Sequence, residues 1–172
     1  MHYKVEQLIT KEDRHELIDY FKSLPSNIGH IDYNLYNIDK RYLKQNPPEA
    51  IKKIEERAGR KNYSHYFVMY DEGSYTKMHT DNDDKIGLTI VTLIDTVDLV
   101  GGETIAMIPA KLPENKEGYQ KGDDHKGRVV PRVIRMDVGD SVIYDRSLLH
   151  GVSEIEKGKR LVLGSWISFY LS

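Results

Sequence analysis

The sequence predicts a mainly β domain, an antiparallel sandwich or barrel, with helices at its N-terminal end. From residue 63 onwards, short runs of β-branched and aromatic residues are separated by clusters of Gly, Asp and Lys. Helices do not alternate with these runs, which disfavours a parallel doubly wound sheet. The chain of 172 residues fits one domain, 1–172. We expect residues 1–60 to be mainly helical support and residues 63–170 to form the β core.

The N-terminal third predicts two helices. Thr10 followed by Asp13 indicates a helix N-cap, and Pro25 marks the end of that helix. Apolar residues recur at helical spacing between these points: Leu17, Ile18, Phe21 and Leu24. Residues 46–59, NPPEAIKKIEERAG, predict a second helix, with prolines near its start and a glycine at its end. Between them, residues 30–39 (HIDYNLYNID) fit either a strand or an extended connection.

Five runs in the remainder of the chain predict strands. They are SHYFVMY (64–70), KIGLTIVTLI (85–94), ETIAMIP (103–109), DSVIY (140–144) and RLVLGSWISFYL (160–171). The stretch 111–132, KLPENKEGYQKGDDHKGRVVPR, is long and lacks apolar periodicity. Such a segment in a compact domain is either a lid-like loop over a functional site or a solvated extension, and both interpretations stay open.

Composition excludes several classes of site. The chain has no cysteine, which excludes disulfides, thiolate metal sites, iron–sulfur clusters and cysteine nucleophiles. A transition metal would therefore have to be held by histidine and carboxylate. The net charge of −2 predicts neither a nucleic-acid nor a membrane partner. Because the N-terminus lacks the apolar core of a signal peptide and no run reaches membrane-spanning length, we expect a cytoplasmic location.

His79, Asp81 and His150 form the candidate metal site. His79 and Asp81 stand in MHTDNDD, and His150 stands in LLHGV. In an extended strand, residues 79 and 81 project to the same side, so both can bind one ion. Two histidines and one carboxylate on one face, with open positions opposite, suit non-haem Fe(II) and its oxygen chemistry. A His-x-Asp triplet is weak evidence by itself, and a surface loop is the alternative.

Two further residues are candidates for binding a co-substrate. Arg160 begins the last predicted strand, ten residues after His150. A buried arginine needs a counter-charge, which a dicarboxylate would supply through a bidentate pair. Its alternative is an ion pair with a surface acid such as Glu154. Tyr70, nine residues before His79, can offer a phenol to the same pocket, although most tyrosines lie at the edge of a core.

Together, the stretches YDEGSYTKMHTD, GGET and DVGDSVIYDRSLLHGVSEIEKGKRLVLGSWISF resemble the Fe(II)/2-oxoglutarate-dependent dioxygenase superfamily. The prolyl 4-hydroxylase-like branch is the most similar, over residues 63–170. The resemblance implies a double-stranded β-helix, a jelly-roll or cupin-like barrel backed by helices. It also implies iron ligation by His79, Asp81 and His150, and an ion pair between Arg160 and the distal carboxylate of 2-oxoglutarate.

The function implied by the resemblance is hydroxylation of a C–H bond in a peptide, a protein side chain (prolyl included) or a free amino acid. It requires Fe(II), 2-oxoglutarate and O₂, with ascorbate as an optional reductant. Leu93 stands where many members of the superfamily have a tyrosine, so we expect Thr89 and Tyr70 to complete the co-substrate pocket. The alternative is a non-catalytic sensor module that binds 2-oxoglutarate or a metal on the same barrel.

Overall fold

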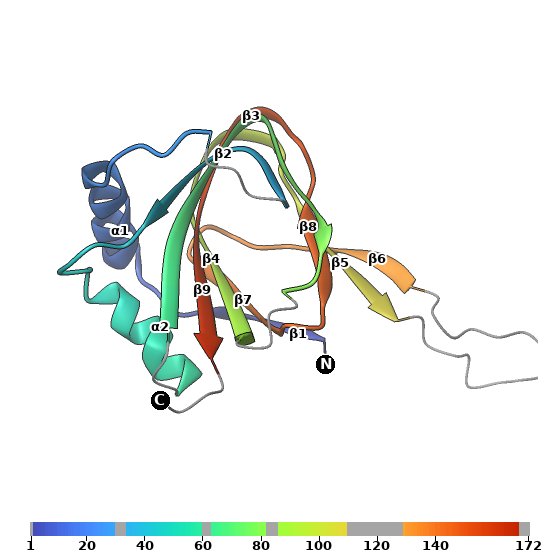
Figure 1. Ribbon diagram of the computed structural model, residues 1–172, viewed down its shortest axis with the longest axis horizontal. Helices are drawn as coiled ribbons and strands as arrows, with labels where there is room; N and C mark the ends of the chain where they lie inside the picture. Colours follow the sequence, from blue (N-terminus) through green and yellow to red (C-terminus); the bar gives the residue numbers. More distant parts are fainter. Residues whose placement is uncertain (1, 30–33, 60–62, 82–85, 110–128, 169–172) are drawn as a thin grey trace, which may run out of the picture.

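The computed structural model describes residues 2–29, 34–59, 63–81, 86–109 and 129–168. Its strands form one strongly curved antiparallel sheet in the order β1-β7-β4-β9-β3-β8-β5-β6, with β2 also paired to β3 (Figure 1). The elements are β1 (Tyr3–Gln7), α1 (Lys11–Ser23), β2 (Leu35–Tyr42), α2 (Ala50–Ala58), β3 (Tyr63–His79), β4 (Ile86–Gly101), β5 (Thr104–Pro109), β6 (Val129–Ile134), β7 (Asp140–Asp145), β8 (Leu149–Val152) and β9 (Ile155–Ser168). This mainly β architecture with two supporting helices confirms the predicted fold class, a double-stranded β-helix.

The two faces of the curved sheet have different surroundings: one lines a cavity, and the other packs against the helices. Along β9, alternate side chains line an internal cavity: Arg160, Val162, Gly164 and Trp166. The side chains between them face outwards, where Leu161, Leu163 and Ile167 join a core with both helices. The alternation follows from the two-residue period of a strand, and it allows one strand to serve the core and the cavity at once.

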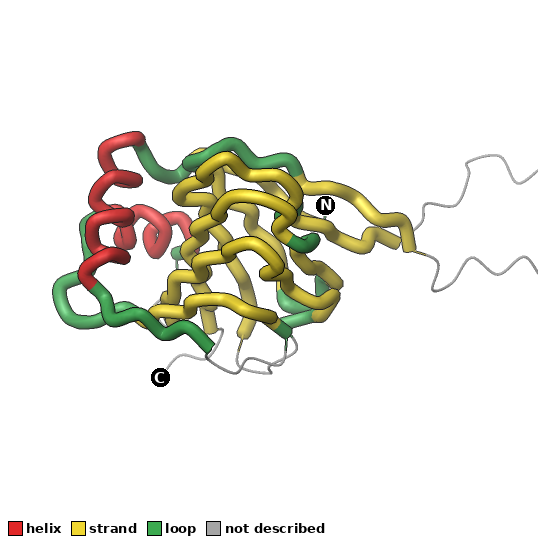
Figure 2. The backbone as a smooth tube through the Cα atoms, turned by 90° about the horizontal axis from the view of Figure 1, so that it is seen from above, coloured by secondary structure: helices red, strands yellow, loops and turns green. Residues whose placement is uncertain are grey.

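The helices cover the outer face of the sheet on one side of the molecule (Figures 1 and 2). The capping box predicted for α1 is confirmed, because Thr10 accepts from the Asp13 amide while the Asp13 side chain accepts from the Thr10 amide. The second helix ends at Gly59, which adopts the left-handed conformation with φ of 66°. Leu17 and Ile54, both fully buried, pack with Phe67 of the sheet.

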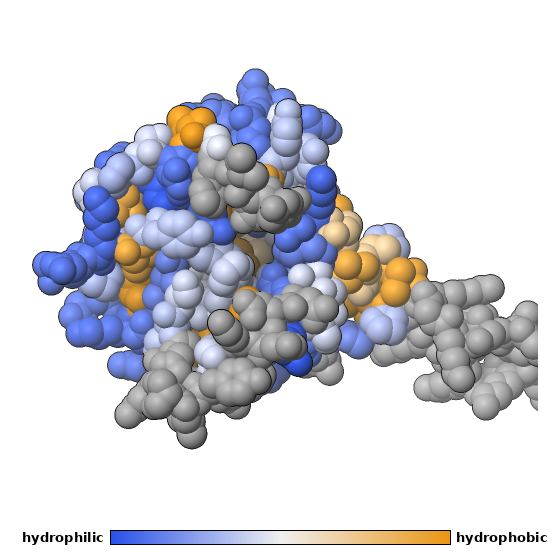
Figure 3. All heavy atoms as spheres, viewed as in Figure 1, coloured by the Kyte–Doolittle hydropathy of each residue, from blue (hydrophilic) through white to orange (hydrophobic). Residues whose placement is uncertain are grey.

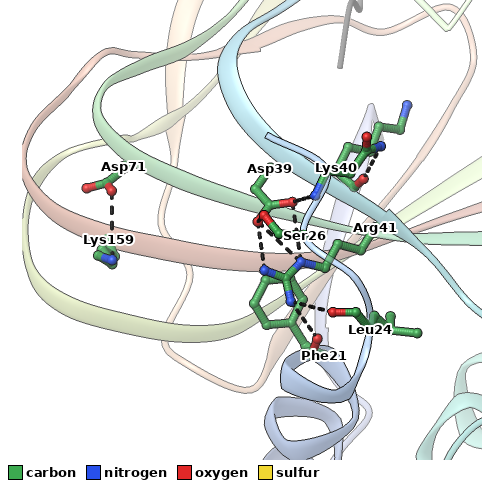
Figure 4. Close-up of polar contacts among 9 residues, drawn as sticks. Phe21, Leu24, Ser26, Asp39, Lys40, Arg41, Asp71 and Lys159 are labelled. Atoms are coloured by element: carbon green, nitrogen blue, oxygen red, sulfur yellow. Dashed lines mark hydrogen bonds and ion pairs between the residues drawn. The ribbon is translucent and has the colours of Figure 1, made fainter. Parts of the chain in front are cut away.

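An arginine anchors α1 to the sheet (Figure 4). Arg41 of β2 donates 2.9 Å hydrogen bonds to the carbonyl oxygens of Phe21 and Leu24, at the end of α1. Asp39 holds the guanidinium through a 2.8 Å ion pair. A helix leaves its last carbonyl groups without partners, and a cation placed there satisfies them. Of the segment 30–39, which fitted either a strand or a connection, residues 35–39 belong to β2, and residues 30–33 lie outside the described part of the chain. Through Asp39 and Arg41, β2 holds the end of α1.

Two expectations need correction. Residues 1–60 are not mainly helical, because β1 and β2 both join the sheet; β1 pairs with β7, with Tyr3 opposite Tyr144. Residues 129–132 of the expected loop 111–132 belong to β6, which begins at Val129. The rest of that loop, apart from 129–132, lies outside the described residues.

The hairpin of β5 and β6 extends from the side of the barrel opposite to the helices (Figures 1 and 2). Apolar side chains gather on it (Figure 3), and Val129, Val130 and Val133 are exposed. Within the described part of the chain, no helix has the length and apolar character to cross a membrane. The cytoplasmic location stays a prediction.

Candidate active site

The sheet register brings the two predicted histidine ligands together. His79 at the end of β3 pairs directly with His150 of β8, and the centroids of their rings are 4.4 Å apart. Asp81 follows β3 and is buried. One potential ligand atom from each of the three residues lies within 4.8 Å of the others. The structure therefore brings His150, which is distant in sequence, to His79 and Asp81, and the three residues form a group that can hold a metal ion.

Hydrogen bonds orient both imidazole rings toward the same point. The Nδ1 atom of His79 lies 2.7 Å from the carbonyl oxygen of Lys77, and Nδ1 of His150 lies 2.9 Å from that of Leu148. A carbonyl oxygen only accepts, so each Nδ1 carries a proton, and in the neutral form of either ring Nε2 presents a lone pair. These Nε2 atoms lie 3.4 and 3.7 Å from Oδ1 of Asp81. Three lone pairs that converge in this way favour a cation between them.

The ionisation states in the group suit metal binding. Burial alone would raise the pKa of Asp81, but the contacts with His79, His150 and Thr89 outweigh it and lower the pKa overall. The carboxylate is therefore charged at neutral pH. Burial lowers the pKa of His150 and keeps its ring neutral, as a ligand must be. Two imidazole nitrogens and one carboxylate oxygen are a donor set that fits Fe(II).

The group opens into a cavity of about 240 Å³ inside the barrel. Besides the three residues, the polar residues of its wall include Lys40, Tyr66, Tyr70, Thr104, Tyr144, Arg160 and Trp166. Apolar side chains such as Val68 and Val162 complete the lining. The cavity therefore combines a candidate metal site with charged and hydrogen-bonding groups on an otherwise apolar wall, as small-molecule sites do.

Arg160 places a positive charge in this wall. The residue is 3% exposed, and Nη2 donates a 2.7 Å hydrogen bond to Oγ1 of Thr104. Its guanidinium carbon lies 5.3 Å from the centre of the Tyr70 ring. Among the described residues, no carboxylate forms an ion pair with Arg160. Burial lowers the pKa of Arg160, yet a guanidinium remains protonated at every physiological pH. The cavity wall therefore carries a buried positive charge, which an anionic ligand would neutralise.

The other predicted residues occupy different positions. Tyr70 lines the cavity, with its hydroxyl 2.7 Å from Oγ1 of Thr76. Thr89 is buried and donates a 2.7 Å hydrogen bond to Oδ2 of Asp81. Leu93 is buried in an apolar cluster with Tyr70. The hydroxyl of Thr89 thus supports the carboxylate of Asp81, and a role toward the co-substrate stays a prediction for both Thr89 and Tyr70.

Several residues of the cavity wall were not singled out from the sequence, and two of them, Thr104 and Tyr144, contact predicted site residues. Thr104 ends the GGET motif, and its hydroxyl accepts a hydrogen bond from Arg160. Tyr144 places its hydroxyl 3.1 Å from Nε2 of His150, and burial raises its pKa well above the ordinary value. A sequence signal for Tyr144 exists in hindsight, because it shares the inward face of β7 with Val142, which also lines the cavity.

No protein-family model matches the chain, and no curated protein matches it. Solved structures do. A prolyl-4-hydroxylase from Pseudomonas putida is 13% identical, with a TM-score of 0.69 and 99% of this chain and 95% of that chain covered. A viral collagen prolyl hydroxylase of Paramecium bursaria Chlorella virus-1, solved with 2-oxoglutarate, is 18% identical, with a TM-score of 0.65 and coverage of 97% and 96%.

A third similar structure is a prolyl hydroxylase from Trichoplax adhaerens in complex with a peptide fragment of the oxygen degradation domain of hypoxia-inducible factor. It is 11% identical, with a TM-score of 0.68 and coverage of 97% and 83%. At these identities the comparisons establish the fold. The chain is built like the 2-oxoglutarate–Fe(II) oxygenases, prolyl hydroxylases among them, as the resemblance in its sequence predicts.

Proposed function

We propose that the chain is an Fe(II)- and 2-oxoglutarate-dependent dioxygenase that hydroxylates a C–H bond of a peptide, a protein side chain or an amino acid. The observation that carries the proposal is the charge of Arg160, buried in the same cavity as His79, Asp81 and His150. A metal site alone would fit many functions. A metal site combined with a buried cation suits a co-substrate that chelates the metal at one end and carries a carboxylate at the other.

Each group has a task in this proposal. His79, Asp81 and His150 hold Fe(II), and Arg160 pairs with the distal carboxylate of 2-oxoglutarate, steadied by Thr104. With O₂, the iron centre supplies a reaction in which 2-oxoglutarate becomes succinate and CO₂ while a C–H bond of the substrate becomes C–OH. One oxygen atom of O₂ enters succinate and the other enters the hydroxyl group. The apolar side chains of Val68 and Val162 line the cavity beside these polar groups.

The proposed substrate class draws on the solved structures with the same fold. The Trichoplax enzyme is described in complex with a peptide fragment, which supports a peptide or protein substrate for this chain as well. A prolyl side chain is one member of that class. Ascorbate would serve as an optional reductant that keeps the iron in the Fe(II) state.

An anaerobic titration with Fe(II) and 2-oxoglutarate tests the proposal. The chelate absorbs weakly in the visible, and we expect this band in the wild type and its loss in His79→Ala. Arg160→Met should still bind the metal but need roughly 10- to 100-fold more 2-oxoglutarate, the effect of losing a charge-assisted bidentate pair. Arg57→Met is the matched control, because Arg57 pairs with Glu6 at the surface and should leave the titration unchanged.

The titration and a second measurement separate the enzyme from the sensor. A wild type without the band would overturn the proposal at the level of co-substrate binding. In the second measurement, O₂ is admitted without added substrate and succinate is assayed after prolonged incubation. If the band forms but no succinate is released, the result would favour a module that binds 2-oxoglutarate and does not consume it. Slow succinate release that depends on His79 and Arg160 would support the dioxygenase.

A further inference from the structure

Tyr144 brings a hydroxyl group directly to the candidate metal site. The residue belongs to β7, is 5% exposed and lines the cavity. Its hydroxyl oxygen lies 3.1 Å from Nε2 of His150, and its ring packs against that imidazole, with centroids 4.6 Å apart. The sheet register places Tyr144 between Tyr3 of β1 and Thr89 of β4. The neighbouring strands and the imidazole together direct this hydroxyl toward the group that can hold a metal ion.

The hydrogen bond between Tyr144 and His150 cannot persist when a metal ion is bound. Nδ1 of His150 is committed to the carbonyl oxygen of Leu148, so Nε2 is the atom left to bind the ion. A phenol is neutral at pH 7, so the hydroxyl donates to the lone pair of Nε2. A metal ion takes this lone pair and leaves the donor without its acceptor. Among the described residues, Nε2 is the one hydrogen-bond partner of the Tyr144 hydroxyl, so a new acceptor has to come from the contents of the cavity.

Coordination geometry supplies an acceptor at a suitable distance. Nitrogen and oxygen ligands lie about 2.1 Å from a divalent metal ion, so two ligand atoms at a right angle are about 3 Å apart. The Tyr144 hydroxyl lies at a similar distance, 3.1 Å, from Nε2 of His150. Three protein ligands on one face leave three positions of an octahedron open, and Nε2 is adjacent to two of them. A co-substrate that chelates through two atoms therefore places at least one of them in a position adjacent to Nε2.

Two opposite charges act on the Tyr144 hydroxyl. Burial has the largest effect and raises the pKa of Tyr144; the Asp81 carboxylate raises this pKa further, and the Arg160 guanidinium lowers it. The phenol is therefore close both to the candidate metal ligands and to the cation proposed to hold the far end of the co-substrate. A ligand that extends from the metal to Arg160 occupies the cavity that this residue lines.

We infer that Tyr144 binds the co-substrate: with Fe(II) and 2-oxoglutarate in the cavity, its hydroxyl donates to an oxygen atom of 2-oxoglutarate at the metal. The inference rests on the proposed function, because it requires 2-oxoglutarate to chelate an ion held by His79, Asp81 and His150. Carboxylate oxygens are strong acceptors, whereas a metal-bound water has a lone pair committed to the ion. The hydroxyl therefore stabilises the metal-free protein through His150 and the fully loaded protein through the co-substrate. The protein with metal alone gains neither hydrogen bond, so Tyr144 favours the joint binding of metal and co-substrate.

Separate titrations of metal and co-substrate test the inference. Co(II) replaces Fe(II), so that no turnover takes place, and calorimetry follows first the metal and then 2-oxoglutarate added to the Co(II)-saturated protein. In Tyr144→Phe, we expect the dissociation constant for 2-oxoglutarate to rise roughly tenfold, the effect of one lost hydrogen bond to a charged acceptor. The affinity for Co(II) should not fall, because the hydroxyl has no acceptor in the protein with metal alone. A loss of packing would instead weaken the binding of both.

The anaerobic spectrum with Fe(II) gives a second readout. A hydrogen bond to a chelating oxygen stabilises the orbital of 2-oxoglutarate that accepts charge from iron, so the visible band of Tyr144→Phe should lie at shorter wavelength than that of the wild type. Arg160→Met acts at the far carboxylate and should leave the position of the band unchanged. Tyr63→Phe is the matched control, because the Tyr63 hydroxyl donates to the carbonyl oxygen of Glu55 and its residue does not line the cavity. Its loss should change neither the titrations nor the band.

A second substitution keeps the inference testable if Tyr144→Phe does not fold, which thermal unfolding shows. In that case, 3-fluorotyrosine is introduced at position 144 alone. This residue keeps the ring and the hydroxyl, and its more acidic phenol is a stronger hydrogen-bond donor. We then expect the opposite changes: 2-oxoglutarate should bind more tightly to the Co(II)-loaded protein, and the visible band with Fe(II) should move to longer wavelength.

The outcomes separate this inference from the proposed function. A wild type that fails to bind 2-oxoglutarate contradicts the proposed function and the inference with it. Normal binding in the wild type, with the same affinity and the same band in Tyr144→Phe, overturns the role of Tyr144 and leaves the dioxygenase standing. An intense visible band in the Fe(III)-loaded wild type that is absent from Tyr144→Phe would make the phenolate a ligand of the metal, and it would overturn the inference as well.

Discussion

Thr89 of β4 donates a 2.7 Å hydrogen bond to Oδ2 of Asp81. Because Thr89 occupies Oδ2, the carboxylate presents its other oxygen, Oδ1, to the imidazole nitrogens of His79 and His150. The hydroxyl thus fixes the rotation of the one anionic group in the candidate metal site. Partners of this kind hold a ligand in the geometry that the metal requires, so that less freedom is lost when the ion binds.

Thr89→Val should weaken metal binding. The substitution keeps the shape of the side chain and removes the hydroxyl, so Asp81 gains rotational freedom and a buried oxygen loses its donor. We expect the dissociation constant for Co(II), measured by calorimetry, to rise by roughly 10- to 100-fold. Thr92→Val is the control, because the Thr92 hydroxyl lies 2.7 Å from Ser141, away from the metal ligands. Equal affinities in Thr89→Val and the wild type would contradict a positioning role.

The sequence predicts the metal ligands because their signals are local or strictly spaced. His79 and Asp81 are two residues apart, a spacing that puts both side chains on one side of an extended segment, and His150 stands ten residues before Arg160, so pattern and chemistry agree without knowledge of the sheet. The helix starting after Thr10 is predictable for the same reason, since its capping residues are neighbours in sequence.

The missed features depend on contacts between distant segments. The strand β1 is only five residues long, its Lys4 and Val5 are exposed, and its partner β7 lies far along the chain, at Asp140–Asp145. Nothing local indicates that pairing. Lys40 was overlooked because a lysine in sequence reads as a surface residue, and its burial arises only when β2 joins β3 beside Trp166. Sequence patterns assign such residues by their average behaviour, whereas the sheet register decides where they lie.

Tyr144→Phe should change the affinity for metal in a direction that reveals the role of the hydroxyl. In the absence of a metal, the hydroxyl donates to Nε2 of His150, which is the atom that a metal would take. Metal binding must break that hydrogen bond, which stabilises the metal-free protein by about 1 kcal/mol. Removing the hydroxyl should therefore tighten Co(II) binding by roughly fivefold, measured by competition with a chelator. Weaker binding would instead mean that the hydroxyl stabilises the loaded site. Tyr3→Phe, on the strand that pairs with β7, is the control.

Asp39 should make the protein less stable in acid. Burial alone would raise its pKa, but hydrogen bonds from Arg41, the Asn27 amide and Ser26 lower the pKa overall, below that of the unfolded chain (Figure 4). A depressed pKa stabilises the fold at pH values above the unfolded pKa of about 4, and this stabilisation is lost as the pH falls through the folded pKa.

Asp39→Asn tests this dependence. The substitution should lower the free energy of unfolding by about 1–3 kcal/mol at pH 7, because the Arg41 guanidinium loses its charged partner at the end of α1. The difference from the wild type should shrink as the pH falls below about 4 and through the lowered pKa of Asp39 in the folded state, where the wild-type carboxylate also becomes neutral. Urea unfolding between pH 3 and 7 measures both values. Asp71→Asn is the control, since Asp71 is exposed and its ion pair with Lys159 is 3.7 Å long. A difference that does not depend on pH would assign the effect to packing and not to charge.

His65→Phe should reduce stability and leave the candidate metal site intact. His65 joins three elements: its Nε2 lies 2.8 Å from Oε1 of Glu55 in α2, and its Nδ1 lies 2.8 Å from Oγ of Ser165 in β9. A Glu–His–Ser chain resembles a hydrolytic triad in its residue types, but Ser165 is fully buried on the face of the sheet that packs against the helices. No substrate can reach Ser165 there, so the hydrogen-bonded Glu–His–Ser series is a connection between α2 and the sheet.

His65→Phe leaves the Ser165 hydroxyl unsatisfied and should lower the free energy of unfolding, measured in urea, by about 1–3 kcal/mol, with an unchanged affinity for Co(II). His15→Phe, at an exposed position of α1, should cost far less. A loss of metal affinity in His65→Phe without a loss of stability would contradict this assignment, because only a link to the cavity could produce it.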